Sequence, residues 1–243
     1  MESKETTDPR ETVSSSSPVL TMKVYVGTVS LLASWTWASP LAERQVPCPG
    51  RGISSTRSTE VRTRFRSFGV IIDSVPDINA TTELQVKYGN IPENLGNVFT
   101  VPQTLQEPTI TFDPERGFDP ATTKYTYIQV DPDAPGPKLP LLRHFLHHIV
   151  YDLQASCIAN QSPKTQARYM PLTPLSVSPH RYVSLLYRQV PGYKPPPLDL
   201  IEDIVRAPFD LQQYVDQGNL MLVGGNFMRE GLGSTVSEAE ASY

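Results

Sequence analysis

The sequence has no excess of positive charge. Its 243 residues include 21 lysines and arginines against 25 aspartates and glutamates, which gives a formal net charge of −4. Binding to nucleic-acid backbones depends on clustered Lys and Arg, and no basic stripe appears along this chain. Nucleic acid is therefore not expected among its partners.

Long apolar runs are also scarce. The run that stands out covers residues 24–38, and it is too short to span a membrane comfortably. Lys23 precedes it and small residues lie at Ala38 and Ala42, which is the layout of a secretory signal; a buried strand or helix is the alternative. We expect residues 22–42 to be a signal peptide, the protein to enter the secretory pathway, and the chain to have no stable membrane span.

The segments on either side of this signal lack a core pattern. Residues 1–21 are polar and rich in Ser and Thr, so we expect a disordered extension, or a stretch wrongly included in the gene with Met22 as the true start. Residues 43–60 are predicted to be a linker and residues 230–243 a flexible tail. Acceptor patterns for N-glycosylation at Asn79 and Asn160 fit the secretory route.

Cysteine is nearly absent, whereas proline is abundant. The only cysteines are Cys48 and Cys157; a disulfide between them would tie the linker to the domain, and two unrelated thiols are the alternative. The 24 prolines are roughly twice the ordinary share of about 5%. This composition indicates a folded domain with many fixed loops.

Between residues 61 and 229 the apolar residues recur mostly with a period of two. Strand-like runs are "KYTYIQVD", "RHFLHHIVYDL", "RYVSLLYRQV" and the apolar "NLMLVGGNFM", with Gly- and Pro-rich segments between them. Short helices are expected at 208–216 and at 200–206. With no repeat and no second domain in view, we predict a single, mainly β domain with small peripheral helices.

The segment "YTYIQVDPDAPGP" places two carboxylates at the end of a predicted strand. The prolines after Asp131 and Asp133 hold the backbone extended and restrict the loop. Two nearby carboxylates repel unless cations or donors offset them. A capped turn and a functional site are both open interpretations at this point.

The four histidines all fall between residues 144 and 180. Strict alternation places His144 and His148 on one strand face and His147 on the other, while His180 and Tyr182 share a face. Two imidazoles, a phenol and a carboxylate pair at neighbouring strand ends can surround a small anion. Any one histidine alone is more often structural.

The motif "DPDAP", then "HFL", then "HRYVSLLY" resembles the phosphatidylethanolamine-binding protein family. The resemblance covers about residues 64–229 and implies a two-sheet antiparallel β fold with a small-anion pocket at one end. It implies pocket carboxylates at Asp131 and Asp133, pocket histidines at His144 and His180, and a pocket tyrosine at Tyr182. No cofactor and no metal are implied.

Fungal relatives of this kind imply an accessory or catalytic role in maleidride biosynthesis, where alkyl maleic anhydrides dimerise. The ligand would be a small carboxylate, an anhydride or phosphate, with Asp131, His144 and His180 as hypothetical catalytic residues and a ketosteroid-isomerase-like enzyme as partner. A carboxypeptidase Y-type inhibitor and a phospholipid- or phosphate-binding protein are alternatives. A metal-dependent hydrolase using His144 and His148 is disfavoured, because the alternation indicates a strand and not a helix.

Overall fold

The computed structural model describes residues 48, 52–198 and 206–233. The expected N-terminal extension and signal peptide lie outside the described residues, as do residues 200–205 of the second expected helix and residues 234–243 of the expected tail. No helix within the described ranges is long and apolar enough to cross a membrane.

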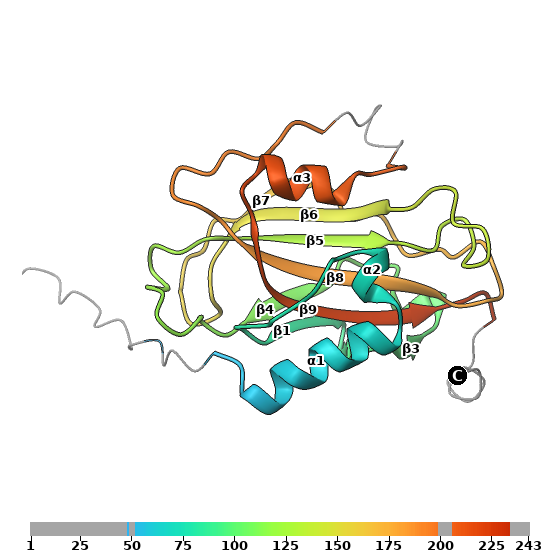
Figure 1. Ribbon diagram of the computed structural model, residues 1–243, viewed down its shortest axis with the longest axis horizontal. Helices are drawn as coiled ribbons and strands as arrows, with labels where there is room; N and C mark the ends of the chain where they lie inside the picture. The colour runs from blue at the N-terminus through green and yellow to red at the C-terminus, as the bar shows by residue number, and fades with distance from the viewer. Residues whose placement is uncertain (1–47, 49–51, 199–205, 234–243) are drawn as a thin grey trace, which may run out of the picture. The chain divides into compact units, whose positions relative to one another are not determined.

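A six-stranded sheet with the order β3-β9-β8-β5-β6-β7 is the centre of the domain (Figure 1). Its edge strand β3 pairs in parallel with β9, and the remaining neighbours are antiparallel. The four runs that the sequence predicted as strands form the four central members of this sheet. The strands are β3 (Asn97–Phe99), β5 (Tyr125–Asp131), β6 (Phe145–Leu153), β7 (Lys164–Ala167), β8 (His180–Arg188) and β9 (Met221–Glu230).

A three-stranded antiparallel sheet packs on one face of the large sheet. It has the order β2-β1-β4, formed by β1 (Leu84–Tyr88), β2 (Ile91–Pro92) and β4 (Thr109–Phe112), and the 3-10 turn η1 (Val101–Gln103) precedes β4. The side chains of β1 alternate strictly between buried and exposed, so its inner face contributes Leu84, Val86 and Tyr88 to the core between the sheets. The two-sheet, mainly β prediction is confirmed.

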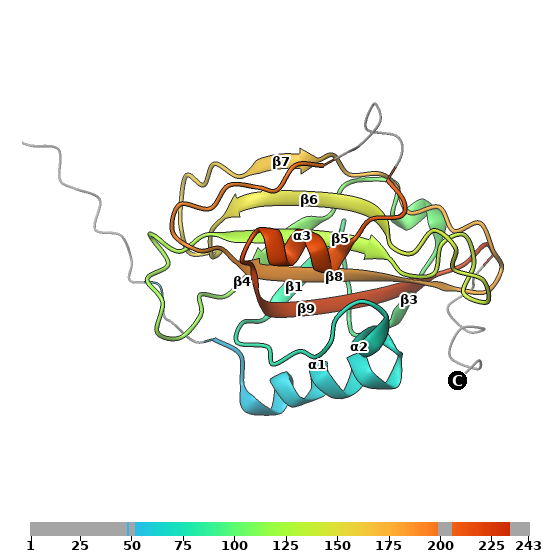
Figure 2. The same cartoon turned by 45° about the horizontal axis from the view of Figure 1, so that its top comes forward.

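Helices cover the opposite face of the large sheet. Figures 1 and 2 show α1 (Ser55–Ser67) along the β9 side and α3 (Leu211–Gln217) beside β5 and β6, with the short α2 (Val70–Asp73) next to α1. Phe65 of α1 and Leu211 of α3 enter the same apolar cluster as Phe227 of the sheet. The sequence predicted α3 within about three residues, but it missed α1, whose first half lies in the expected linker.

Gly225 shows how closely α1 approaches the sheet. A Cβ at this position would lie 2.7 Å from a ring carbon of Phe65 and 2.9 Å from Ile78. Only glycine leaves room for the Phe65 ring, whose centroid is 5.5 Å from that of Phe227 in an edge-to-face arrangement. Gly225 of "LVGGNF" therefore serves the packing of α1, whereas its neighbour Gly224 faces Thr82 and Leu84.

The two cysteines form a disulfide between Cys48 and Cys157. The bond joins the chain ahead of α1 to the loop between β6 and β7, across a sequence separation of 109 residues. Such a bond stabilises a protein mainly by restricting its unfolded chain.

We expect Cys157→Ser to lower the free energy of unfolding by about 2–4 kcal/mol, because the long loop closed by the disulfide opens. Urea unfolding of the variant, and of the wild type with and without reductant, measures the change. Ser162→Ala, an exposed substitution in the same connection, is the control and should unfold like the wild type. Two free thiols titrated in the oxidised wild type would contradict the pairing.

Candidate functional site

Asp131 and His180 form a buried pair at the end of the central strands. Asp131 ends β5 and His180 begins β8, and Oδ2 of the aspartate lies 2.7 Å from Nδ1 of the imidazole. The other carboxylate oxygen accepts a hydrogen bond of 2.7 Å from the backbone N–H of Asp133. Because a carboxylate only accepts, Nδ1 carries a proton and Nε2 is left for another partner.

Two further rings complete this cluster. Tyr182, two residues along β8 from His180, stacks on the imidazole with ring centroids 6.2 Å apart. His147 meets the edge of Tyr182 at 5.3 Å, and its Nδ1–H donates to the backbone carbonyl of Met170 at 2.9 Å. Burial lowers the pKa of His147 to about 4 and raises that of Tyr182 well above its usual range. Both rings are therefore neutral near pH 7.

His147 belongs to the cluster because β6 contains a bulge. Gln129 of β5 pairs with His148, and the next residue, Val130, pairs with Leu146, so His147 is the extra residue. Leu146 and Ile149 pack on the helical side, while His147 and His148 contact Tyr182 and Tyr127 on the other side. The strict alternation predicted from sequence is therefore wrong here.

The structure does not bring Asp133 into the cluster. Its carboxylate accepts from Arg181, with Oδ2 2.8 Å from both the backbone N and Nε, and Oδ1 2.6 Å from Nη2. Arg181 also donates to Oδ2 of Asp73 at 2.8 Å. Asp133 is thus neutralised in an ion-pair network that ties the DPD loop to α2.

His144 also lies in that second network. It precedes β6, and its Nε2 is 2.9 Å from the backbone carbonyl of Asp73. The neighbouring Arg143 donates to Oδ1 of Asp73 at 2.8 Å and to the carbonyl of Pro132 at 2.9 Å. Of the five residues predicted from sequence, the structure gathers Asp131, His180 and Tyr182 and places Asp133 and His144 apart from them.

Glu230 lies next to His180, although the sequence predicted it as the first residue of the flexible tail. The two residues are paired across β8 and β9, and the glutamate is fully buried. One of its oxygens, Oε2, accepts from the hydroxyl of Thr104 at 2.7 Å, while Oε1 has no hydrogen-bond partner among the described residues. Burial raises the pKa of Glu230 to about 7, against the opposing effect of His180.

A row of polar side chains crosses four neighbouring strands of the large sheet. Asn226, Ser184, Gln129 and His148 are cross-strand partners on β9, β8, β5 and β6, and all are buried. Glu93 packs against the row and accepts from Ser184 at 3.0 Å and from Gln129 at 3.4 Å. Burial raises the pKa of Glu93 to about 8, so the side chain is mostly protonated at neutral pH. The sequence analysis did not predict this row of buried polar residues.

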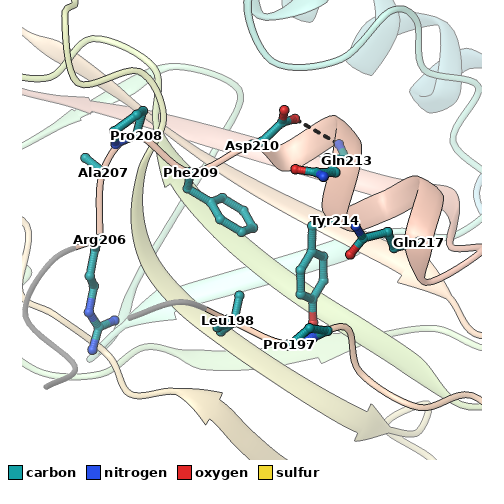
Figure 3. A pocket seen from close by; sticks show the side chains of 10 residues that line it. All are labelled: Pro197, Leu198, Arg206, Ala207, Pro208, Phe209, Asp210, Gln213, Tyr214 and Gln217. Atoms are coloured by element: carbon teal, nitrogen blue, oxygen red, sulfur yellow. Dashed lines mark hydrogen bonds between the residues drawn. The ribbon is translucent and has the colours of Figure 1, made fainter. Parts of the chain in front are cut away.

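No group of three or more His, Cys, Asp or Glu side chains in the described part of the chain has the arrangement of a metal site. A cavity of about 230 Å³ lies elsewhere, between α3 and the segment 206–210 (Figure 3). Arg206 lines this cavity and also donates to the backbone carbonyl of His147 at 3.2 Å. None of the predicted site residues lines the cavity. Arg206 on its wall nevertheless contacts the backbone of the β6 bulge at His147.

A model of the family described as "Phosphatidylethanolamine-binding protein" matches residues 76–239, more than half of the sequence. The chain belongs to this family. Members with solved structures share the fold: a carboxypeptidase Y inhibitor complexed with its cognate proteinase has a TM-score of 0.62 at 22% identity, covering 72% of this chain and 96% of that one. The phosphatidylethanolamine-binding protein from Plasmodium vivax has a TM-score of 0.57 at 19% identity, covering 70% and 96%.

Relatives with higher sequence identity come from Toxocara canis and Nicotiana tabacum. A 26 kDa secreted antigen of Toxocara canis is 33% identical over 144 residues, which are 58% of this chain and 52% of the antigen. CEN-like protein 1 of Nicotiana tabacum is 30% identical over 136 residues, 56% of this chain and 73% of the relative. The chain thus spans about half the length of the Toxocara relative.

The buried acid Glu93 predicts a pH-dependent stability for this family member. A carboxyl whose pKa is raised from 4.5 unfolded to about 8 folded stabilises the fold at low pH and loses that contribution as pH rises toward 8. Between pH 6.5 and 8.5 we expect the wild type to lose up to about 2 kcal/mol from this residue. Urea unfolding at the two pH values should show a smaller loss in Glu93→Gln.

Glu230 acts in the same direction, because its pKa is also raised. Glu230→Gln should therefore reduce the pH dependence of the free energy of unfolding in the lower part of the same range. The double variant should show a smaller pH dependence than either single variant. The histidines with lowered pKa, His147 and His148, act in the opposite direction, since they destabilise the fold as pH falls below about 6.5, and they contribute only at the lower limit of this range. An unchanged pH slope in Glu93→Gln would show that its carboxyl is ionised in the folded protein.

Proposed function

We propose that this chain binds a small anion at the cluster of Asp131, His180, Tyr182 and His147. The observation that supports the proposal most directly is the 2.7 Å bond between Asp131 and His180. It fixes the imidazole so that Nε2 points away from the aspartate, toward the loop 175–178 at the molecular rim. A carboxylate or a phosphate oxygen is a suitable partner for a protonated Nε2.

The neighbouring groups suit an anion of low charge. Tyr182 stays neutral and offers an O–H donor, and a protonated Glu230 adds no negative charge. Asp131 compensates the positive charge of His180 when the imidazole is doubly protonated, which limits the net charge that the site can attract. A small anion with one or two charges, such as a carboxylate, a dicarboxylate or a phosphate group, therefore fits better than a polyanion.

Within this class, the finer proposal is a role in maleidride-type biosynthesis. An alkyl maleic anhydride opens in water to a cis-dicarboxylate, which is a small anion with an apolar substituent. The Asp131–His180 pair could also act as a general base toward such a molecule. A ketosteroid-isomerase-like enzyme as partner belongs to this finer proposal.

The binding proposal predicts that alanine substitutions of His180, His147 and His144 affect anion affinity to different extents. Titration calorimetry with phosphate and with maleate should detect binding to the wild type, and His180→Ala should weaken it about tenfold or more, because a charge-assisted hydrogen bond is lost. His147→Ala should weaken it less. His144→Ala is the matched control and should bind like the wild type, since its imidazole faces Asp73.

If His144→Ala abolishes binding and His147→Ala does not, His144 is the binding histidine, as the sequence predicted. The anion site is then not the cluster of Asp131, His180, Tyr182 and His147. Thermal unfolding of each variant separates lost binding from lost folding. Phosphate and maleate that both fail to bind to folded wild type would contradict the proposal.

The disulfide supports a second proposal, that the protein matures in the secretory pathway. Disulfides persist in oxidising compartments and are rare in the cytosol. Asn79, in an Asn-Ala-Thr triplet, lies exposed in the loop before β1, so it is accessible to glycosylation.

Expression in a eukaryotic secretory host should therefore give a product that shifts to lower mass on treatment with an N-glycosidase. Asn79→Gln should remove that shift, and Asn160→Gln reports on the second acceptor, which is also exposed. Secreted wild type of unmodified mass would contradict glycosylation at both positions.

A further inference from the structure

A serine lies next to Nε2, the ring nitrogen of His180 that does not bond to Asp131. The hydroxyl oxygen of Ser176 is 3.1 Å from Nε2, while Nδ1 of the same ring is 2.7 Å from Asp131. The three side chains therefore form a continuous hydrogen-bonded series of hydroxyl, imidazole and carboxylate. This is the order of groups in a Ser-His-Asp catalytic triad, which is recognised by geometry and not by sequence order.

The supporting contacts match the roles of those groups. Asp131 is 3% exposed and is held by the backbone of Asp133 through its second oxygen, so it orients the imidazole rigidly. His180 is buried, whereas Ser176 is half-buried at the rim. The serine hydroxyl also lies 2.7 Å from the backbone carbonyl of residue 178, and rotation about one bond directs its proton to Nε2 instead.

We propose that Ser176, His180 and Asp131 form a catalytic triad that hydrolyses neutral carboxylic esters carrying an aliphatic chain. Ser176 is the nucleophile, His180 the general base and acid, and Asp131 the positioning residue.

The reaction balances with water as the only co-reactant. The Ser176 oxygen attacks the ester carbonyl and its proton moves to Nε2 of His180; the C–O bond to the alcohol then breaks, and the alcohol leaves with that proton. Water attacks the acyl-serine in the same way and gives its proton to Nε2. The carboxylic acid leaves, and Ser176 recovers the proton, so one ester and one water become one acid and one alcohol.

The surroundings of Ser176 select the substrate class. Its neighbours Leu175 and Val177 are 74% and 76% exposed, and Leu139 in the facing loop is 62% exposed. Leu232 joins them, since its backbone N–H donates to the carbonyl of Ser176 at 3.0 Å. Exposed apolar side chains around a nucleophile favour a substrate with an aliphatic chain.

The backbone of Gly136 leaves space beside the nucleophile. A Cβ at this position would lie 3.8 Å from Cβ and 4.0 Å from Oγ of Ser176.

The triad uses two residues of the proposed anion site, and its product is a carboxylate of the class proposed to bind there. Ser176 itself has no part in the proposed anion site. The two proposals can therefore fail separately.

A fluorophosphonate probe and p-nitrophenyl butyrate test the triad on the full-length protein. The probe should modify wild type at Ser176, identified by peptide mass mapping, and the wild type should hydrolyse the ester with a burst of p-nitrophenol. Ser176→Ala should lose the label, and its kcat should fall by about 10⁴-fold or more, because the nucleophile is removed. Asp131→Asn should lower kcat with little change in KM, because the aspartate orients the base without touching the ester.

Ser178→Ala is the matched control, since this exposed serine lies in the same loop and its side chain is not part of the triad; it should react like the wild type. If Ser176→Ala does not fold, Ser176→Cys keeps the shape and should lose fluorophosphonate labelling. Equal ester hydrolysis in wild type, Ser176→Ala and Ser178→Ala, or unlabelled wild type that still binds phosphate, overturns the triad while the anion site stands. A labelled Ser176 in a protein that binds neither phosphate nor maleate supports the triad and overturns the anion site.

Discussion

The pairing of two adjacent residues on β8 with two aspartates of the DPD loop organises this end of the protein. His180 bonds to Asp131 at 2.7 Å, and Arg181 binds Asp133 through its backbone and its guanidinium. Neighbouring residues of a strand point to opposite faces, so the two pairs lie on opposite sides of the sheet. The carboxylate of Asp131 orients the His180 imidazole, and the carboxylate of Asp133 holds the loop that follows Asp131. The repulsion expected between two close carboxylates is relieved because each has its own cationic or hydrogen-bonding partner.

Much of the fold followed from local patterns, and the site followed only in part. The central strands have alternating or continuous apolar runs, and the structure brings Asp131, His180 and Tyr182 together near the ends of β5 and β8, as that periodicity predicted. His147 could not be found this way, because a single extra residue in β6 reverses the faces beyond it. That bulge depends on contacts of Met170 and Arg206 with the His147 backbone, which are distant in sequence. The residue pattern around His144 contained no sign of the bulge.

Other features were hidden for the same reason. The α1 segment is strongly polar, with only Val61 and Phe65 buried, so it resembles a linker until Gly225 shows where the helix packs. Glu230 follows a run of buried strand residues, and no sequence pattern marked it as a neighbour of the cluster. It lies there because it pairs with His180 between β9 and β8. Short strands such as β2 and β3 have too few residues for a period to be recognised. Interactions between distant segments decided each of these cases.

The buried polar row between the sheets carries a cost that the apolar core must offset. Glu93, Gln129 and His148 each bury a polar atom with no hydrogen-bond partner among the described residues, and such groups destabilise a fold unless they are neutral or partnered. The neutral states of Glu93 and His148 keep that cost moderate. Because the hydrogen bonds join Ser184, Gln129 and Tyr88 across both sheets, the row also fixes their relative register. This is a reason to keep polar side chains in a core that apolar ones could fill.

Nε2 of His180 can serve the proposed anion site or the proposed triad, but not both at once. An imidazole protonated at both nitrogens donates Nε2–H to an anion, whereas an imidazole protonated only at Nδ1 accepts the proton of Ser176. An anion in the site stabilises the first state and removes the base that hydrolysis needs. A carboxylate product would then inhibit its own formation until it leaves. In a protein where both activities hold, the lifetime of the bound anion would set the rate at which Ser176 can react again, and the apolar rim would control that lifetime through the substituent on the anion.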